Sequence, residues 1–337
     1  MGGIWYRRIE MVGALSEIVG YKSGLALNRI EIVDHLPEYE STLIGDDDAI
    51  IRLRAEDYEE ILSTLLYRLG CIASPPIVFP GIGMFHKYKE DPKKYELYES
   101  VLGLFLKMFP DLEKRSPKDE PIDLTPFLME VEKRYKDTHA MEIALEYIGE
   151  IEQYLYQNPW ARIRRYEWVD IKELSDLFKS ESLDTYYGKF FDQRFIDYLN
   201  RNFDSIDRIN WRKFEGLVCE FFHREGFYIQ IGAGRNDDNI DGRIWPKEDD
   251  KNLPPTTLVQ CKREKGKVGK VVVKALWADL ISERAKSGLI VTTTALSPGA
   301  VKVCTARSYP INQANRKTLK KWIKSMRSSN TGVFMGE

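Results

Sequence analysis

Four residues in the second half of the chain have side chains that together could hydrolyse a phosphodiester bond. They are Glu215, Asp241, Gln260 and Lys262. Carboxylates can hold a divalent cation, which neutralises charge on a phosphate and lowers the pKa of a bound water. Mg²⁺ prefers hard oxygen donors and keeps several waters, so one or two carboxylates and a neutral oxygen are enough. A lysine beside the metal could position or deprotonate the attacking water, or offset charge on phosphorus.

Three short β-runs, separated by glycine-rich or polar turns, are expected to position three of these residues. The runs cover 228–231, 240–245 and 257–262. Alternate residues of a strand share a face, so the pattern predicts that Gln260 and Lys262 point the same way. Asp241 can join them from the neighbouring strand.

A helix beginning near residue 210 is expected to position Glu215. Its apolar residues recur at helical spacing and mark a buried stripe: Phe214, Leu217, Val218, Phe221 and Phe222. Glu215 lies one step, about 100°, from the edge of this stripe, and a carboxylate there can reach a site at the margin of a sheet. Glu220 lies roughly 140° further round the helix and is expected to be solvated. Glu215 is therefore the predicted third metal ligand, beside Asp241 and Gln260.

The residues from about Asp207 to about Met326 resemble the Mrr-like restriction endonucleases of the PD-(D/E)XK nuclease superfamily, in the variant whose last motif is Gln-x-Lys. The segments that carry the resemblance are 211–218, 224–227, 237–241, 258–263, 288–293 and 297–300. The resemblance implies a Mg²⁺-dependent DNA endonuclease, with Mn²⁺ expected to substitute. It assigns the active site to Glu215, Asp241, Gln260 and Lys262.

Two features of the loop before Asp241 complicate this assignment. Asn239 stands where the family usually has glycine, although asparagine tolerates left-handed backbone angles and the turn can survive. Either Asp237 or Asp238 could also share the metal. A restriction enzyme acting against foreign or modified DNA is the first interpretation. The alternatives are a structure-selective repair or junction nuclease, and a catalytically silent nucleic-acid-binding regulatory protein.

The predicted fold class is α/β, with a restriction-endonuclease-like αβββαβ core preceded by a mainly α-helical domain. In the C-terminal part we expect helices near 211–225, 269–285, 298–307 and 316–326, with a fourth strand near 288–293. The predicted domains are an acidic helical domain at 1–158, a helical connector at 159–204, the endonuclease domain at 205–330 and a tail at 331–337.

The two parts of the chain differ in charge. The whole chain carries a net charge of −2, but residues 201–337 hold 25 Lys and Arg against 15 Asp and Glu. Basic residues follow the Gln-x-Lys strand and are predicted to contact the DNA backbone: Arg263, Lys265, Lys267, Lys270 and Lys274. The acidic N-terminal domain could bind a partner protein. Cutting both strands of a duplex needs two sites, so a homodimer or larger assembly is expected.

Several other classes of protein are excluded by what the sequence lacks. The four cysteines are scattered and predict reduced thiols, as in a cytoplasmic protein. The four histidines are isolated and no Cys-x-x-Cys pair is present, which argues against structural zinc. No phosphate-binding loop of the Gly-x-x-x-x-Gly-Lys-Ser/Thr type occurs. No apolar run is long enough to predict a membrane span.

Overall fold

The computed structural model describes residues 3–45, 47–72, 80–115, 122–136, 138–161, 166–234 and 240–327. Contacts divide the chain into two compact units. The first comprises Met1–Ile4, Arg52–Ser63 and Ser74–Ile163, and the second comprises Trp5–Ile51, Thr64–Ala73 and Arg164–Glu337. No helix among the described residues is both long and apolar enough to cross a membrane.

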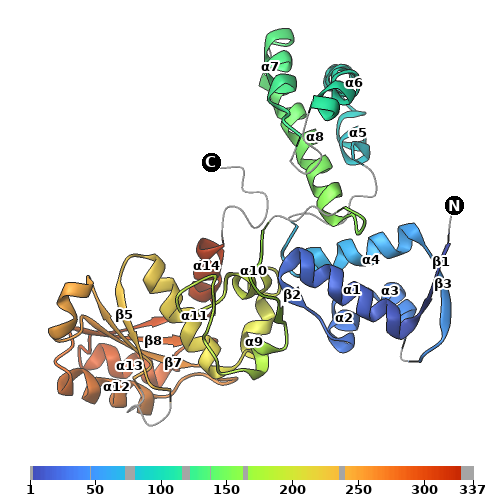
Figure 1. The fold of residues 1–337 in the computed structure, drawn as a ribbon. Helices are drawn as coiled ribbons and strands as arrows, with labels where there is room; N and C mark the ends of the chain where they lie inside the picture. The colour runs from blue at the N-terminus through green and yellow to red at the C-terminus, as the bar shows by residue number, and fades with distance from the viewer. Residues whose placement is uncertain are drawn as a thin grey trace. The chain divides into compact units, whose positions relative to one another are not determined.

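A five-stranded sheet forms the centre of the C-terminal domain (Figure 1). Its strands are β5 (Tyr228–Ile231), β6 (Gly242–Trp245), β7 (Thr257–Lys262), β8 (Ser287–Thr292) and β9 (Ile311–Ala314), in that spatial order. The pairs β5–β6 and β6–β7 are antiparallel, whereas β7–β8 and β8–β9 are parallel. The predicted αβββαβ core is confirmed.

Helices cover both faces of this sheet. They are α11 (Trp211–Arg224), α12 (Lys270–Ser282), α13 (Pro298–Ala306) and α14 (Arg316–Met326). Residues of α12 and α13 share a hydrophobic cluster with Leu258 of β7 and Ile290 of β8. On the other face, a side chain at Gly242 would meet Cys219 of α11 and Val259 of β7. Phe221 of α11 stacks on Trp322 of α14 with ring centroids 4.2 Å apart. This pairing joins the first and last helices of the domain.

Strand β9 was not predicted from the sequence. Its four residues are Ile-Asn-Gln-Ala, so it has neither an apolar run nor a regular alternation that would indicate a strand. It forms because β8 supplies a parallel partner, with Gly288 in register with Ile311. The predicted strand at 240–245 begins instead at Gly242. Asp241 therefore lies just before β6.

The N-terminal part is mostly helical, as predicted. In the second unit it contains α1 (Arg8–Ser23), β2 (Leu25–Ala26), α2 (Arg29–His35) and α3 (Glu38–Ile44). Two strands, β1 (Gly3–Arg7) and β3 (Ile50–Arg54), pair with each other. Helix α4 (Ala55–Arg68) follows β3. The second unit also contains β4 (Lys172–Glu173), α9 (Asp176–Lys179), α10 (Gln193–Arg201) and the 3-10 helix η1 (Phe203–Asp207).

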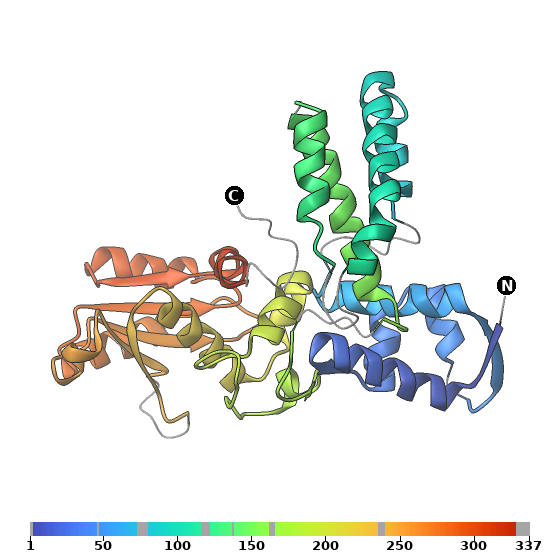
Figure 2. The ribbon, with the colours of Figure 1, turned by 45° about the horizontal axis from the view of Figure 1, so that its top comes forward.

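The first unit is built around three long helices that run side by side (Figure 2). These are α6 (Pro92–Arg115), α7 (Thr125–Arg134) and α8 (Thr138–Gln157), and the shorter α5 (Ile82–Tyr88) packs on α6. Phe105 contacts Phe127 and Tyr147 edge to face, with ring centroids 5.2 and 5.0 Å apart. These aromatic contacts lie within the cluster of buried side chains that forms the core of the bundle.

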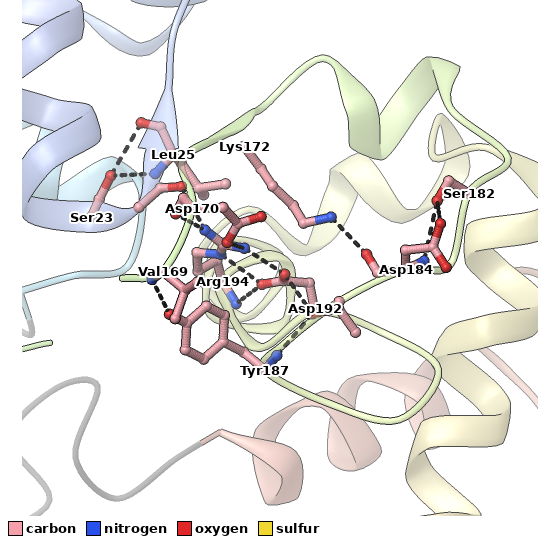
Figure 3. Close-up of polar contacts among 12 residues, drawn as sticks. Ser23, Leu25, Val169, Asp170, Lys172, Ser182, Asp184, Tyr187, Asp192 and Arg194 are labelled. Carbon is pink, nitrogen blue, oxygen red and sulfur yellow. Dashed lines mark hydrogen bonds and ion pairs between the residues drawn. The ribbon is translucent and has the colours of Figure 1, made fainter. Parts of the chain in front are cut away.

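A buried arginine joins the N-terminal helices to the segment before the nuclease core (Figure 3). Arg194 of α10 is 2% exposed, and its Nη1 donates to the carbonyl oxygens of Gly24 and Asp170 at 3.0 and 2.8 Å. Its Nη2 donates to carboxylate oxygens of Asp192 and Asp170 at 2.7 and 3.0 Å. Gly24 has a positive φ of 73°, and a Cβ there would lie 2.7 Å from the Arg194 side chain. The parallel pairing of β2 with β4 completes this connection.

Glu220 is buried, and the prediction that it is solvated is wrong. It is 1% exposed, because the segment before α10 folds over this side of α11. Its Oε2 accepts the N–H groups of Lys189, Phe190 and Phe191 at 2.8, 2.7 and 3.3 Å. Its Oε1 accepts from Arg224 Nε at 2.7 Å. A helical projection cannot show a partner that lies about 30 residues away in the sequence.

Replacing Glu220 by glutamine is expected to lower the free energy of unfolding by about 1.5–3 kcal/mol, the usual contribution of hydrogen bonds to a charged group. The amide keeps one acceptor oxygen but loses the charge that three N–H groups and Arg224 share. Urea unfolding of the variant and of Glu225→Gln, which changes an exposed residue at the end of the same helix, measures the difference. Equal midpoints for the two variants would contradict the structural role of Glu220.

Candidate active site

Asp241 is held where β6 begins beside the end of β7. It is 9% exposed, and its backbone N–H donates to Val259 O at 3.0 Å while its carbonyl accepts from Gly232 N at 2.9 Å. Its carboxylate Oδ2 accepts the backbone N–H of Cys261 at 2.6 Å. These bonds hold the Asp241 carboxylate beside Cys261, the residue between Gln260 and Lys262.

Glu215 projects from α11 toward this carboxylate and is 6% exposed. Burial and the negative charge of Asp241 raise the pKa of Glu215 to about 8, and hydrogen bonding to Asp241 adds to this rise. Arg212 acts in the opposite direction by hydrogen bonding to Glu215. The two carboxyl groups therefore share a site in which both ionise readily only when further positive charge is supplied.

Arg212 is a residue of this site that the sequence reasoning missed. Its Nη1 donates to Glu215 Oε2 at 2.7 Å, and its Nη2 donates to Gly232 O at 2.8 Å. Gly232 in turn donates its N–H to the carbonyl of Asp241. Arg212 thus links the first turn of α11 to the end of β5. Opposite charges three residues apart on a helix are a signal that could have indicated the pair.

Gln260 and Lys262 leave β7 on the face opposite to Cys261. Gln260 is in register with Ile290, which packs with α12 and α13, and side chains paired across strands share a face. The Cys261 thiol lies on the α11 side, where burial raises its pKa and the charges of Asp241 and Glu215 add to the effect. The structure brings the carboxyl groups of Glu215 and Asp241 together. Gln260 and Lys262 flank Cys261, whose backbone N–H donates to the Asp241 carboxylate.

The donor atoms fit a hard divalent cation. Gln260 is 2% exposed, and its Oε1 has no hydrogen-bond partner among the described residues. The carboxylates of Glu215 and Asp241 supply oxygen donors of the kind that Mg²⁺ prefers, whereas the Gln260 side chain leaves β7 on the other face of the sheet. No group of three or more His, Cys, Asp or Glu side chains suited to a metal occurs within the described ranges. Asp237, Asp238 and Asn239 lie outside the described residues.

The basic residues after β7 lie at the surface. Lys265 and Lys267 lie in the connection to α12, and Lys270 and Lys274 lie on α12; all four are exposed. Arg263 is also exposed, and its Nη1 donates to the carbonyl of Asp207 at 2.9 Å. Positive charge therefore follows directly from the strand that carries Gln260 and Lys262.

Residues 206–323 match the family model Mrr_cat, which is described as a restriction endonuclease. The C-terminal part of the chain is an Mrr-like restriction endonuclease domain. The matched range closely follows the resemblance predicted from about Asp207 to about Met326. The Mrr-like domain contains the whole five-stranded sheet and places the Glu215–Asp241 pair inside the matched region.

One similar solved structure is the MspJI restriction endonuclease in complex with a 27-mer oligonucleotide. The two chains are 16% identical, with a TM-score of 0.27, and the similarity covers 58% of this chain and 41% of the MspJI chain. This chain therefore spans less than half of that protein. No curated protein matches the chain.

The raised pKa of Glu215 predicts that the metal-free protein becomes less stable as pH rises. In the folded protein the Glu215 carboxyl keeps its proton between pH 4.5 and about 8, whereas in the unfolded chain it loses the proton near 4.5. The unfolded state then binds fewer protons, so the contribution of this group to the free energy of unfolding falls across that range.

Thermal unfolding in EDTA at several pH values measures this dependence. The Glu215→Gln variant cannot ionise, so its midpoint should fall less steeply with pH than that of the original protein. Glu248→Gln, at an exposed position outside the site, should keep the original slope. The raised pKa would be refuted by parallel curves for the original protein and Glu215→Gln.

Proposed function

We propose that this protein is a metal-dependent DNA endonuclease that hydrolyses phosphodiester bonds as a restriction or defence enzyme against foreign or modified DNA in the cytoplasm. The observation that carries the proposal is the pair of buried carboxyl groups of Glu215 and Asp241 at the end of β7, inside an Mrr-like domain. Such a pair disfavours full ionisation without a cation and is suited to holding one.

Each of the four predicted residues has a role in this proposal. Asp241 and Glu215 would hold Mg²⁺ or Mn²⁺ through carboxylate oxygens, with a backbone oxygen of Gln260 as a neutral third donor. The bound ion supplies Lewis-acid stabilisation of the phosphate and a more acidic water. Lys262 would orient the attacking water, or place positive charge beside the phosphorus as negative charge builds up there. Arg212 keeps the Glu215 carboxylate aimed at Asp241.

The exposed basic residues after β7 support double-stranded DNA as the substrate. Arg263, Lys265, Lys267, Lys270 and Lys274 would neutralise backbone phosphates near the cut. A homodimer or larger assembly would bring two active sites to the two strands. In this proposal residues 205–330 carry the chemistry and 159–204 connect them to the acidic residues 1–158, which would contact a partner protein or contribute to the oligomer.

Plasmid cleavage by the purified protein tests the proposal. We expect nicked and linear products with Mg²⁺ or Mn²⁺ and none with EDTA, on methylated or unmethylated plasmid. Lys262→Ala should lower the rate at least about 100-fold, as expected when one group that stabilises transition-state charge is removed. Lys286→Ala is the matched control, because this exposed lysine precedes β8 at the end of the sheet opposite to Lys262.

Two results would count against this proposal. Cleavage by Lys262→Ala at the original rate would remove Lys262 from the site. Intact plasmid under every metal condition would contradict the nuclease activity itself.

A further inference from the structure

The second unit contains a cavity of about 440 Å³ that shares no residue with the candidate active site. Its walls come from α2, the end of α4, the segment from β4 to α9, α10 and η1. The volume lies in the range of about 300–1,000 Å³ that is usual for small-molecule sites. The lining combines arginines, carboxylates and aromatic rings, and these groups together indicate the class of ligand.

Two arginines in the lining are suited to bind an anion. Neither the guanidinium of Arg68 nor that of Arg208 forms an ion pair within the part of the chain that the structure describes. Both arginines line the cavity together with His35. Burial lowers the pKa of His35, the hydrogen bond to the Glu31 carbonyl and the charge of Asp34 raise it, and the charges of the two arginines lower it. Because like charges repel, an anion that contacts both guanidinium groups would be favourable.

Arg208 is held in an orientation that leaves donors available. Its guanidinium carbon lies 5.6 Å from the centroid of the Phe178 ring, and Nη2 donates to Ser205 Oγ at 3.4 Å. Stacking on the ring uses the face of the guanidinium, whereas phosphate binding uses the N–H groups along its edge. The remaining N–H groups of Arg208 are therefore available to a phosphate.

Aromatic rings and carboxylates complete the lining. Tyr198 contacts Phe178 edge to face with centroids 6.4 Å apart, and the Tyr198 hydroxyl lies 3.1 Å from His35 Nε2. His35 Nδ1 lies 2.6 Å from the carbonyl of Glu31, which fixes the histidine ring. The carboxylates of Glu31 and Asp34 also line the cavity. Carboxylates accept hydrogen bonds from the exocyclic amino groups of nucleobases, and aromatic rings stack on the bases themselves.

We propose that this cavity binds a nucleotide whose base carries an amino group. The phosphate contacts Arg68 and Arg208, the base packs against Phe178, whose ring Tyr198 supports from behind, and the amino group donates to Asp34 or Glu31. The nucleotide is either a free mononucleotide or one unit of a DNA strand, since both present the same chemical groups. This site goes beyond the proposed nuclease function and does not depend on it.

Isothermal titration of the full chain in EDTA tests the proposal, because no metal-dependent cleavage occurs under these conditions. The probes are AMP, CMP, GMP and UMP, together with a short single-stranded oligodeoxyadenylate. We expect saturable binding of the amino-bearing nucleotides that is tighter than that of UMP. Binding of AMP would identify a free nucleotide as the ligand, and binding of the oligonucleotide alone would identify a strand unit.

Variants then assign the binding to this cavity. Arg208→Ala and Arg68→Ala should each weaken binding at least about tenfold, the effect of losing one charge-assisted contact. Arg208→Lys retains the charge without the planar fork and should bind more weakly than the original protein. Arg307→Ala changes an exposed arginine at the end of α13 and should bind normally. Unfolding midpoints without ligand show whether each variant is folded.

The proposal would be overturned by an absence of binding for every probe. It would also be overturned by binding that persists unchanged in the folded Arg208→Ala and Arg68→Ala variants.

Discussion

Replacing Asp241 by asparagine is expected to lower the rate of DNA cleavage by about a thousandfold. The Asp241 carboxylate is buried beside Glu215 and carries the charge that would hold a divalent cation. Loss of a metal ligand removes several kcal/mol of transition-state stabilisation, and a thousandfold change in rate corresponds to about 4 kcal/mol. Initial rates of supercoiled plasmid cleavage with Mg²⁺ measure the effect.

The asparagine variant should remain folded and should still bind DNA. Its side-chain oxygen can accept the N–H of Cys261 as the carboxylate does, so the junction of β6 and β7 is retained. Fluorescence anisotropy with a labelled duplex in Ca²⁺ or EDTA separates binding from cleavage. Asp249→Asn, an exposed change in the connection between β6 and β7, is the matched control and should cleave normally. Equal rates for both variants would place the catalytic centre elsewhere.

Replacing Arg194 by alanine is expected to lower the free energy of unfolding of the second unit by about 3–5 kcal/mol, the usual effect of removing one partner of a buried ion pair. The Asp192 side chain, which is 3% exposed, would then be a buried carboxylate without its guanidinium partner. The carbonyl groups of Gly24 and Asp170 would also lose their donor. Stacking with Trp168 and Tyr187, whose ring centroids lie 5.3 and 4.9 Å from the guanidinium carbon, would be lost as well.

Denaturant unfolding followed by tryptophan fluorescence measures this loss. The double variant Arg194→Met with Asp192→Asn leaves no unpaired buried charge and should recover part of the stability that Arg194→Ala loses. Arg307→Ala, at an exposed arginine of the same unit, should change stability by less than about 0.5 kcal/mol. If Arg194→Ala has no larger effect than Arg307→Ala, the buried network does not stabilise the unit.

Much of the nuclease core could be predicted from the sequence because its signals are local. The apolar stripe of α11 follows a 3.6-residue period, and the alternating or apolar runs of β5, β6, β7 and β8 lie between turn residues. The same locality explains the two errors within the domain. Strand β9 has a polar sequence and forms only because β8 pairs with it, and Glu220 is buried only because residues 189–191 cover it.

For the candidate site, the residue types and their order could be predicted from the sequence. The hydrogen bonds and charge interactions between these side chains could not. Carboxylates, an amide and a lysine at this spacing indicated a metal-assisted hydrolysis and a family. The distance between Arg212 and Glu215, and the influence of Asp241 on the pKa of Glu215, depend on how α11 lies against the start of β6. Periodicity does not encode that arrangement.

The sequence by itself determined the class of the C-terminal domain, the order of its elements apart from β9, and the four candidate site residues, since these depend on local periodicity and a short motif. Only the tertiary structure decided that Arg194 binds the carbonyl of Gly24, which lies 170 residues away, and that residues 5–51 share a compact unit with the nuclease core. It also brought together the arginines and aromatic rings of the proposed nucleotide cavity. Such contacts depend on burial and on partners distant in the chain, and neither is determined by the neighbouring residues.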